Sequence, residues 1–357
     1  MNVTVQDILK LEGHYLGRKA LFGDLHNHAD TSDRSDGTRP LSHWRGALEA
    51  LKVDFAAILD HGQVEHMYKP EWEDGLFLGA TEPGTWFTDS KAEKPCIHYN
   101  ILFEDAKPME ALLEAFPEYE YTGGEHGRFK YPKFTLERFG ELVDFIMAND
   151  GFFVHPHPKQ VMVSDDPLDY LFREYTGLEV IYGDYRNDMT KANYQLWLEL
   201  LALDKKVYAT GGNDNHAVAS DAGLTCIYSE EKKNKRYIQH LREGDITCGS
   251  VGIKMCMGDT KMGGECDFAK QRVVVGVSDF HRSVKNPEHG YRIDLYNDKG
   301  LVCSKEFSCE EPAYLVAAAD VNAKFYRAEV VDVNNGYRIG IGNPIWNCPP
   351  APEETAE

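Results

Sequence analysis

Up to about residue 245 the sequence alternates short apolar runs, typical of β-strands, with stretches of helical periodicity. We predict strands at residues 20–25, 55–59, 76–81, 97–103, 151–154, 178–181 and 207–210, and helices at residues 41–51, 136–148, 189–203 and 234–242. Strands that alternate with helices are typical of a parallel sheet, either open or closed into a barrel. Residues 1–245 are therefore predicted to form an α/β domain.

Two parts of the chain depart from this rhythm. Residues 104–133 form a long connection with many aromatic and charged residues, for which a lid or binding loop and a plain surface excursion are equally good interpretations. From residue 246 to residue 348 short strands follow one another with turn residues between them, which indicates a C-terminal β-sandwich-like domain. Residues 349–357 are typical of a disordered tail.

Histidines and acids fall at the ends of the predicted strands. The first strand is followed by His26-Asn27-His28, and residues at i and i+2 of a strand point the same way, so both imidazoles can reach one ion. The remaining members, in chain order, are Asp60, His61, Glu82, His98, His155, Asp214 and His216. Most of them lie at carboxyl ends of strands, which share one face in a parallel α/β barrel, where such enzymes place their sites.

Imidazole and carboxylate groups are the preferred ligands of zinc, manganese and iron in proteins. A single histidine at a strand end is more often structural or solvated than a metal ligand. Chance does not readily place such residues at successive strand ends of one chain, however. The whole pattern therefore predicts a metal site.

These segments resemble the motifs of the polymerase and histidinol phosphatase (PHP) superfamily, which run HxH with a following SDG, then TDH, a Glu, a His, an HP and a final DxH. In this chain the motifs are His26-Asn27-His28, Ser35-Asp36-Gly37, Leu59-Asp60-His61, Glu82, His98, His155-Pro156 and Asp214-Asn215-His216. The resemblance covers about residues 20–220, with all motifs in order. The C-terminal part, which ends Gly342-Asn343-Pro344-Ile345-Trp346, is similar to the β-domain of the carbaryl-hydrolase-type branch.

The resemblance implies a distorted seven-stranded (β/α)7 barrel that holds two or three divalent ions of manganese, zinc or iron. By motif, the ligands of the first ion would be His26, His28, Glu82 and Asp214. Glu82 would bridge to a second ion held also by His98 and His155, and a third ion would be held by Asp36, His61 and His216. Asp33 is a rival to Asp36, because both lie between His28 and Gly37. Asp60 is expected to orient a ligand histidine rather than to bind metal.

Three residues near the motifs have open roles. His157 shares the face of His155 if the strand continues, and could then protonate a leaving group or bind an oxyanion, but a surface-loop histidine is an equally good interpretation. Lys159 is a further candidate at the same loop. Arg186 could contact substrate, although an ordinary salt bridge is the favoured interpretation.

Clustered divalent ions lower the pKa of bound water and supply hydroxide near neutral pH, so no protein nucleophile is required. The sequence also has no GxSxG elbow and no GxxxxGK[ST] phosphate loop. The predicted function is a metal-dependent hydrolase, and the superfamily favours a phosphoesterase acting on a small phosphorylated substrate. One alternative is hydrolysis of a carbamate, carboxylic ester or amide by the same cluster, which the C-terminal similarity favours. Another is a non-catalytic metal-binding module, which a missing ligand would favour.

The formal net charge of −20 should repel nucleic acid and anionic membranes. The expected partner is therefore a small-molecule substrate, with no nucleic acid and no membrane. The sequence shows no signal peptide and no apolar run of membrane-spanning length. Its eight cysteines include no CxxC pair. These features predict a cytoplasmic protein with free thiols.

Overall fold

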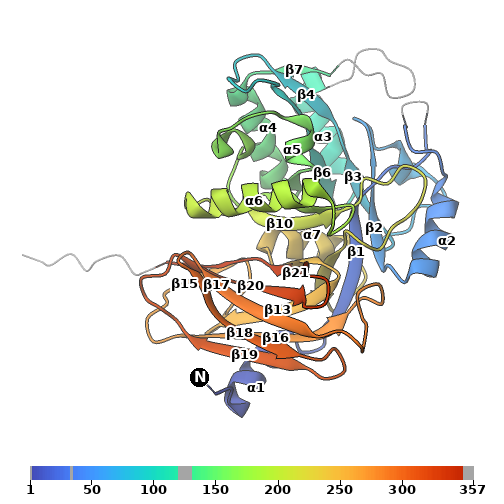
Figure 1. Ribbon diagram of the computed structural model, residues 1–357. Helices are drawn as coiled ribbons and strands as arrows, with labels where there is room; N and C mark the ends of the chain where they lie inside the picture. The colour runs from blue at the N-terminus through green and yellow to red at the C-terminus, as the bar shows by residue number, and fades with distance from the viewer. Residues whose placement is uncertain (1, 33–34, 120–130, 349–357) are drawn as a thin grey trace, which may run out of the picture.

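A computed structural model describes residues 2–32, 35–119 and 131–348 of the chain. A large mixed sheet runs through the molecule, with helices around its N-terminal half and further strands stacked on its C-terminal half (Figure 1). The mixed α/β class predicted from the sequence is therefore confirmed.

Seven strands of the N-terminal half lie side by side in the order β10-β9-β8-β6-β3-β2-β1. Their bounds are β1 (Lys19–Asn27), β2 (Phe55–Asp60), β3 (Phe77–Thr81), β6 (Asn100–Phe103), β8 (Phe152–His155), β9 (Gly177–Tyr182) and β10 (Tyr208–Gly212). The two ends of this row meet, because the backbone N–H of His28 donates to Asn215 O and that of Asn215 donates to His26 O. A closed seven-stranded barrel stays a proposal, since the same sheet continues beyond β1.

One strand of the row runs against the others, contrary to the predicted all-parallel arrangement. β6 pairs antiparallel with β3 and with β8, whereas β1 to β3 and β8 to β10 pair parallel. The predicted strand at 97–103 is divided at Tyr99 into β5 (Cys96–His98) and β6. Because β6 is reversed, its first residues, beside His98, lie at the carboxyl ends of its neighbours.

The helices α2 (Leu41–Leu51), α4 (Leu136–Ala148), α6 (Asp188–Ala202) and α7 (Asn234–Glu243) lie close to the predicted ranges. At the start of α4, the Thr135 side chain accepts a hydrogen bond from Arg138 N, which satisfies one of the free amides of the first turn. The sequence patterns did not predict α1 (Val5–His14), α3 (Lys107–Ala115) or α5 (Pro158–Val161). Shorter elements are η1 (Glu65–Tyr68), β4 (Gly84–Phe87), η2 (Pro117–Tyr119), β7 (Lys133–Phe134) and η3 (Pro167–Tyr170).

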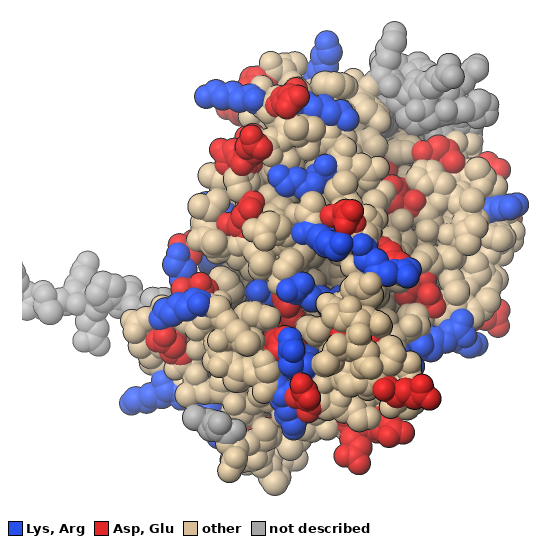
Figure 2. Space-filling view, in the orientation of Figure 1, with Lys and Arg blue, Asp and Glu red and all other residues tan. Residues whose placement is uncertain are grey.

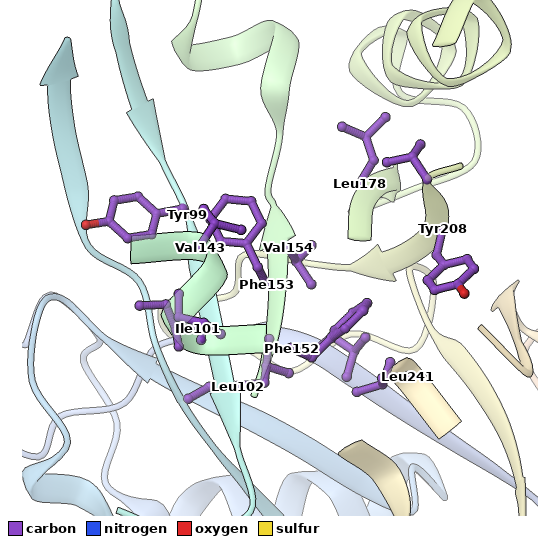
Figure 3. Packing of buried hydrophobic residues seen from close by; sticks show 14 of the residues in the cluster. Tyr99, Ile101, Leu102, Val143, Phe152, Phe153, Val154, Leu178, Tyr208 and Leu241 are labelled. Atoms are coloured by element: carbon purple, nitrogen blue, oxygen red, sulfur yellow. The ribbon is translucent and has the colours of Figure 1, made fainter. Parts of the chain in front are cut away.

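The core of the N-terminal half packs on both faces of its strands. Consecutive residues of β8, Phe152, Phe153 and Val154, are all buried, although neighbouring side chains of a strand point to opposite faces. Figure 3 shows them packed with side chains of β6, β9 and α7, such as Ile101 and Leu241. Burial on both faces explains why these strands are continuous apolar runs in the sequence.

Beyond β1 the large sheet continues through β11 (Thr225–Ser229), β12 (Ile246–Gly249), β21 (Tyr337–Gly342), β20 (Phe325–Asp332), β17 (Tyr291–Asn297) and β18 (Gly300–Phe307). A second sheet consists of β14 (Thr260–Lys261), β13 (Val251–Met257), β16 (Arg272–Phe280) and β19 (Ala313–Ala318), and two short strands are β15 (Glu265–Cys266) and β22 (Ile345–Asn347). Apolar residues of these strands form a cluster of their own, which includes Ile253, Val275 and Val330.

The division of the chain near residue 245 stays a prediction. The separate C-terminal cluster supports it, but the large sheet is continuous across β11 and β12. In addition, α1 packs on the C-terminal strands: Leu11 is buried with Val274, and Glu12 pairs with Lys254 at 2.8 Å (Figure 1). The predicted tail at 349–357 lies outside the described residues, as does 120–130 of the predicted insertion. Within the described part of the chain, no helix has the length and apolar character needed to cross a membrane.

Candidate metal centre

The motif residues converge in three adjoining groups, in each of which one potential ligand atom per residue lies within 4.8 Å of the others. The first group is His26, His28, Glu82 and Asp214; the second is Glu82, His98 and His157; the third is His28, Asp36, His61 and His216. The structure thus brings together every ligand predicted from the sequence except His155, and adds His157. Glu82 and His28 each belong to two groups, so the three groups form one continuous centre.

The end of β1 and the loop after β10 are tied together by a buried carboxylate. Asp24 accepts hydrogen bonds from His26 N at 3.0 Å and Asn213 N at 3.1 Å, and from the side-chain amide of Asn213 at 2.7 Å. Its burial raises its pKa to about 7, although these bonds and His26 oppose the rise. Asp24 therefore holds the HxH motif beside Asp214.

The first group fits a divalent cation. His26 Nε2 lies 3.4 Å from Glu82 Oε2 and 3.3 Å from Asp214 Oδ1, and His28 Nε2 lies 3.1 and 3.2 Å from the same two oxygens. Ligand atoms at about 2.0–2.1 Å from a tetrahedral ion are separated by roughly 3.3 Å. Both histidines are buried and neither Nε2 has a hydrogen-bond partner. A cation is the group that would satisfy two such nitrogens and two carboxylate oxygens together.

The charges at the centre favour ionised carboxylates. Burial lowers the pKa of His26, but Asp214, Glu82 and Glu179 outweigh this effect and raise it well above its usual value. Burial raises the pKa of Glu82, but the neighbouring histidines, first His26 and His98, lower it well below its usual value. The pKa of Asp214 is also lowered, because His26 and His28 outweigh its burial. Ionised carboxylates are the form that binds cations.

In the second group, the structure places His157 where the sequence predicted His155. His157 Nε2 lies 3.1 Å from Glu82 Oε1, and His98 Nδ1 lies 3.0 Å from the same oxygen. His155 instead packs against the rings of Tyr170 and Phe172, and its burial lowers its pKa to about 3. β8 ends at His155, and the backbone of His157 takes φ 27°. The two side chains therefore do not share a face, as they would if the strand continued to His157.

The third group contains the predicted carboxylate. Asp36 Oδ2 lies 3.0 Å from His61 Nε2 and 3.1 Å from His216 Nε2, and Asp36 Oδ1 lies 3.3 Å from His28 Nδ1. Its pKa is lowered because His216, His61 and His28 outweigh partial burial. Its sequence rival, Asp33, lies outside the described residues.

The contacts of Asp60 lie outside the ligand histidines that it was predicted to orient. It accepts hydrogen bonds from Thr31 Oγ1 and from Gln63 Nε2, the latter at 3.1 Å, and lies 3.4 Å from His66 Nδ1. None of these partners belongs to the three groups. Thr31 N also donates to Ser35 Oγ at 3.2 Å, so Thr31 is held by both Asp60 and Ser35.

Three residues at the centre were missed by the sequence analysis. Glu179 Oε1 lies 3.0 Å from His26 Nδ1, Tyr182 donates to Asp214 Oδ2 at 2.9 Å, and Tyr131 Oη lies 2.9 Å from His98 Nε2. For Glu179 the signal available in the sequence was its position as the one acid inside the apolar run of β9. For the place of His157 in the second group it was a second HP dipeptide, His157-Pro158. The two tyrosines had no distinguishing pattern.

The other candidate residues stay outside the centre. Arg186 is exposed and pairs with Asp184 at 2.5 Å, in line with the salt-bridge interpretation. Lys159 donates to Ser164 O at 3.2 Å and lies over the ring of Tyr170. A fourth group, at His240, Glu243 and Asp245, is not assigned to a metal, because Lys261 and Arg18 already neutralise Asp245.

No family model and no curated protein matches the sequence. Solved structures match part of it. An amidohydrolase from Chromobacterium violaceum, with bound sulfate and no metal, has 17% identity and a TM-score of 0.38 over 61% of this chain and 96% of its own. A protein assigned as a metal-dependent phosphoesterase from Bifidobacterium adolescentis has 17% identity and a TM-score of 0.36 over 57% of this chain and 90% of its own. Endonuclease Q, in complex with a 27-mer duplex carrying an abasic lesion, has 13% identity and a TM-score of 0.41 over 63% of this chain and 57% of its own.

One of these proteins is assigned as a metal-dependent hydrolase, but TM-scores this low assign no activity to the chain. The predicted exclusion of nucleic acid as a partner does not stand: one of the matched structures, Endonuclease Q, is in complex with a DNA duplex. The exclusion was drawn from net charge, which is a property of the whole chain. Figure 2 shows that basic and acidic side chains are interspersed on the face in view, and cations bound at the centre would add local positive charge.

Proposed function

We propose that the chain is a metal-dependent hydrolase, foremost a phosphoesterase. The observation that carries the proposal is the position of Glu82, whose two oxygens face different groups. Glu82 Oε2 faces His26 and His28 of the first group, and Glu82 Oε1 faces His98 and His157 of the second. A carboxylate in this position can bridge two cations, an arrangement typical of enzymes that hydrolyse phosphate and related esters.

The residues of the chain hold and orient the reacting groups. When bound, the ions would lower the pKa of a coordinated water and neutralise charge that develops on the oxygen under attack. Tyr182 holds the Asp214 carboxylate through its hydroxyl, and Asp24 fixes the backbone of His26. The Tyr182 pKa is raised, first by burial and then by Asp214, so the phenol stays a hydrogen-bond donor at neutral pH.

A substrate screen tests the reaction class. The purified protein is assayed with added manganese, zinc or iron on a phosphomonoester, a phosphodiester, an abasic DNA duplex, a carbamate and a carboxylic ester. We expect the highest kcat/KM on one of the phosphoesters. Turnover of the carbamate or ester alone would favour the alternative suggested by the C-terminal similarity. Metal binding with no turnover on any substrate would favour a binding module.

We further expect the protein purified without chelator to carry about two or three transition-metal ions per chain, because Glu82 and His28 join three ligand groups. Elemental analysis measures the content directly. Chelator treatment should abolish hydrolysis, and added metal should restore it. Less than one ion per chain, with no uptake on reconstitution, would rule out the proposed centre.

A further inference from the structure

Glu179 is a buried carboxylate whose two oxygens contact two different ligand residues of the proposed centre. It lies in β9 and only 2% of its surface is exposed. Its Oε1 lies 3.0 Å from His26 Nδ1, and its Oε2 accepts the backbone N–H of His157 at 2.8 Å. His26 belongs to the first ligand group and His157 to the second. Glu179 therefore contacts both groups from outside, in addition to the ligand Glu82 that the two groups share.

The contact with His26 selects the nitrogen that faces the ion. In the neutral imidazole that binds a metal ion, a carboxylate beside Nδ1 favours the tautomer that carries the proton on Nδ1, which leaves Nε2 unprotonated. His26 Nε2 is the atom that lies beside Glu82 and Asp214 and has no hydrogen-bond partner. The carboxylate also makes the imidazole a stronger base, and hence a better ligand.

The contact with His157 stabilises an uncommon backbone conformation. His157 takes φ 27° and ψ 53°, a region that residues other than glycine rarely adopt. A hydrogen bond from its N–H to an ionised carboxylate is stronger than one to a neutral acceptor. This conformation turns the His157 ring so that its Nε2 lies 3.1 Å from Glu82 Oε1.

The neighbouring strand leaves room for the pair. A Cβ atom at Gly212 of β10 would lie 2.3 Å from Glu179 Oε1 and 2.7 Å from His26 Cβ. The backbone of Gly212 does not itself require glycine, since its φ lies outside the left-handed region. The absence of a side chain at this position is thus explained by the space that Glu179 and His26 occupy.

From these contacts we infer that Glu179 is a positioning residue that couples the first and second ligand groups, and that neither group binds metal with full affinity without it. The inference rests on the proposed metal centre. Glutamine at this position can satisfy only one of the two contacts. If its oxygen accepts from His157 N, its NH2 faces His26 Nδ1 and favours the tautomer with a proton on Nε2. If the amide group is rotated by half a turn, its NH2 faces the N–H of His157, and two donors then meet with no acceptor between them.

The test is Glu179→Gln, with metal affinity as the readout. Apoprotein is titrated with Zn²⁺ or Mn²⁺ against a competing chelator, and folding is followed by circular dichroism and Tm. We expect the affinity of the centre to fall by about 10- to 100-fold, the usual effect of removing a partner of a metal ligand. The matched control is Glu329→Gln, since Glu329 is also fully buried but pairs with Arg327, Arg338 and Tyr194 away from the centre. It should lower Tm and leave metal affinity unchanged.

A second variant disturbs the same contacts of Glu179 without changing the charge of the protein. Gly212→Ala should displace the Glu179–His26 pair and weaken metal binding in the same direction, and it decides the matter if Glu179→Gln does not fold. Wild-type affinity in folded Glu179→Gln or Gly212→Ala protein would overturn the coupling while leaving the proposed hydrolase intact. If the wild-type protein itself binds no metal, the proposed function fails first.

Discussion

Replacing Glu82 with glutamine is expected to reduce hydrolysis by several orders of magnitude and to lower the metal content of the protein. The substitution keeps the size of the side chain and one oxygen, but removes the negative charge that faces both the first and the second ligand group. Four histidines then surround a neutral amide, and two cations would lose the anion they share. Losses of this size follow when a catalytic metal is missing or displaced.

The measurement is kcat/KM on a substrate found by the screen, together with elemental analysis of the same preparation. Glu329→Gln is again the control, since it neutralises a buried glutamate elsewhere in the fold. The substitution changes no residue of the apolar core, so Glu82→Gln should stay folded with a circular dichroism spectrum like that of the parent. Full metal content and a near-normal rate would place the active site elsewhere.

The second large effect is expected at His157, where sequence and structure disagree. His157→Ala removes an imidazole that lies 3.1 Å from Glu82 Oε1. We expect loss of one metal ion and a fall in activity of roughly 10²–10³-fold, the scale for removing one electrostatic contributor to a transition state. If His157 acted instead as a general acid, one of the roles that the sequence left open, its loss would lower activity with the metal retained.

His155→Ala is the matched control two residues away. His155 packs against Tyr170 and Phe172 and belongs to none of the three groups, so its loss should lower Tm and leave the metal content unchanged. Elemental analysis of both variants separates the two assignments. Loss of metal in His155→Ala with retention in His157→Ala would restore the ligand set implied by the motifs.

Local patterns were sufficient for much of the fold. The ranges predicted for α2 and α4 match the structure, because an apolar stripe of helical period and, in α4, a capping threonine act within a few residues of the chain. The buried strands were recognised as continuous apolar runs for the same reason. The candidate ligands were also found from neighbouring residues in the chain. An acid or histidine that directly follows a buried strand lies at the end of that strand, where the candidate metal centre is.

The sequence by itself therefore determined the α/β class and the set of residue types available for a metal centre. The tertiary structure decided the rest. Strand direction depends on long-range pairing, which reversed β6 and brought His98 to the centre, and which joined β11 and β12 to the same sheet. The choice of His157 over His155 depends on one backbone angle after β8 and on Glu179, a residue of a neighbouring strand. Such contacts join positions far apart in the chain, so no local pattern records them.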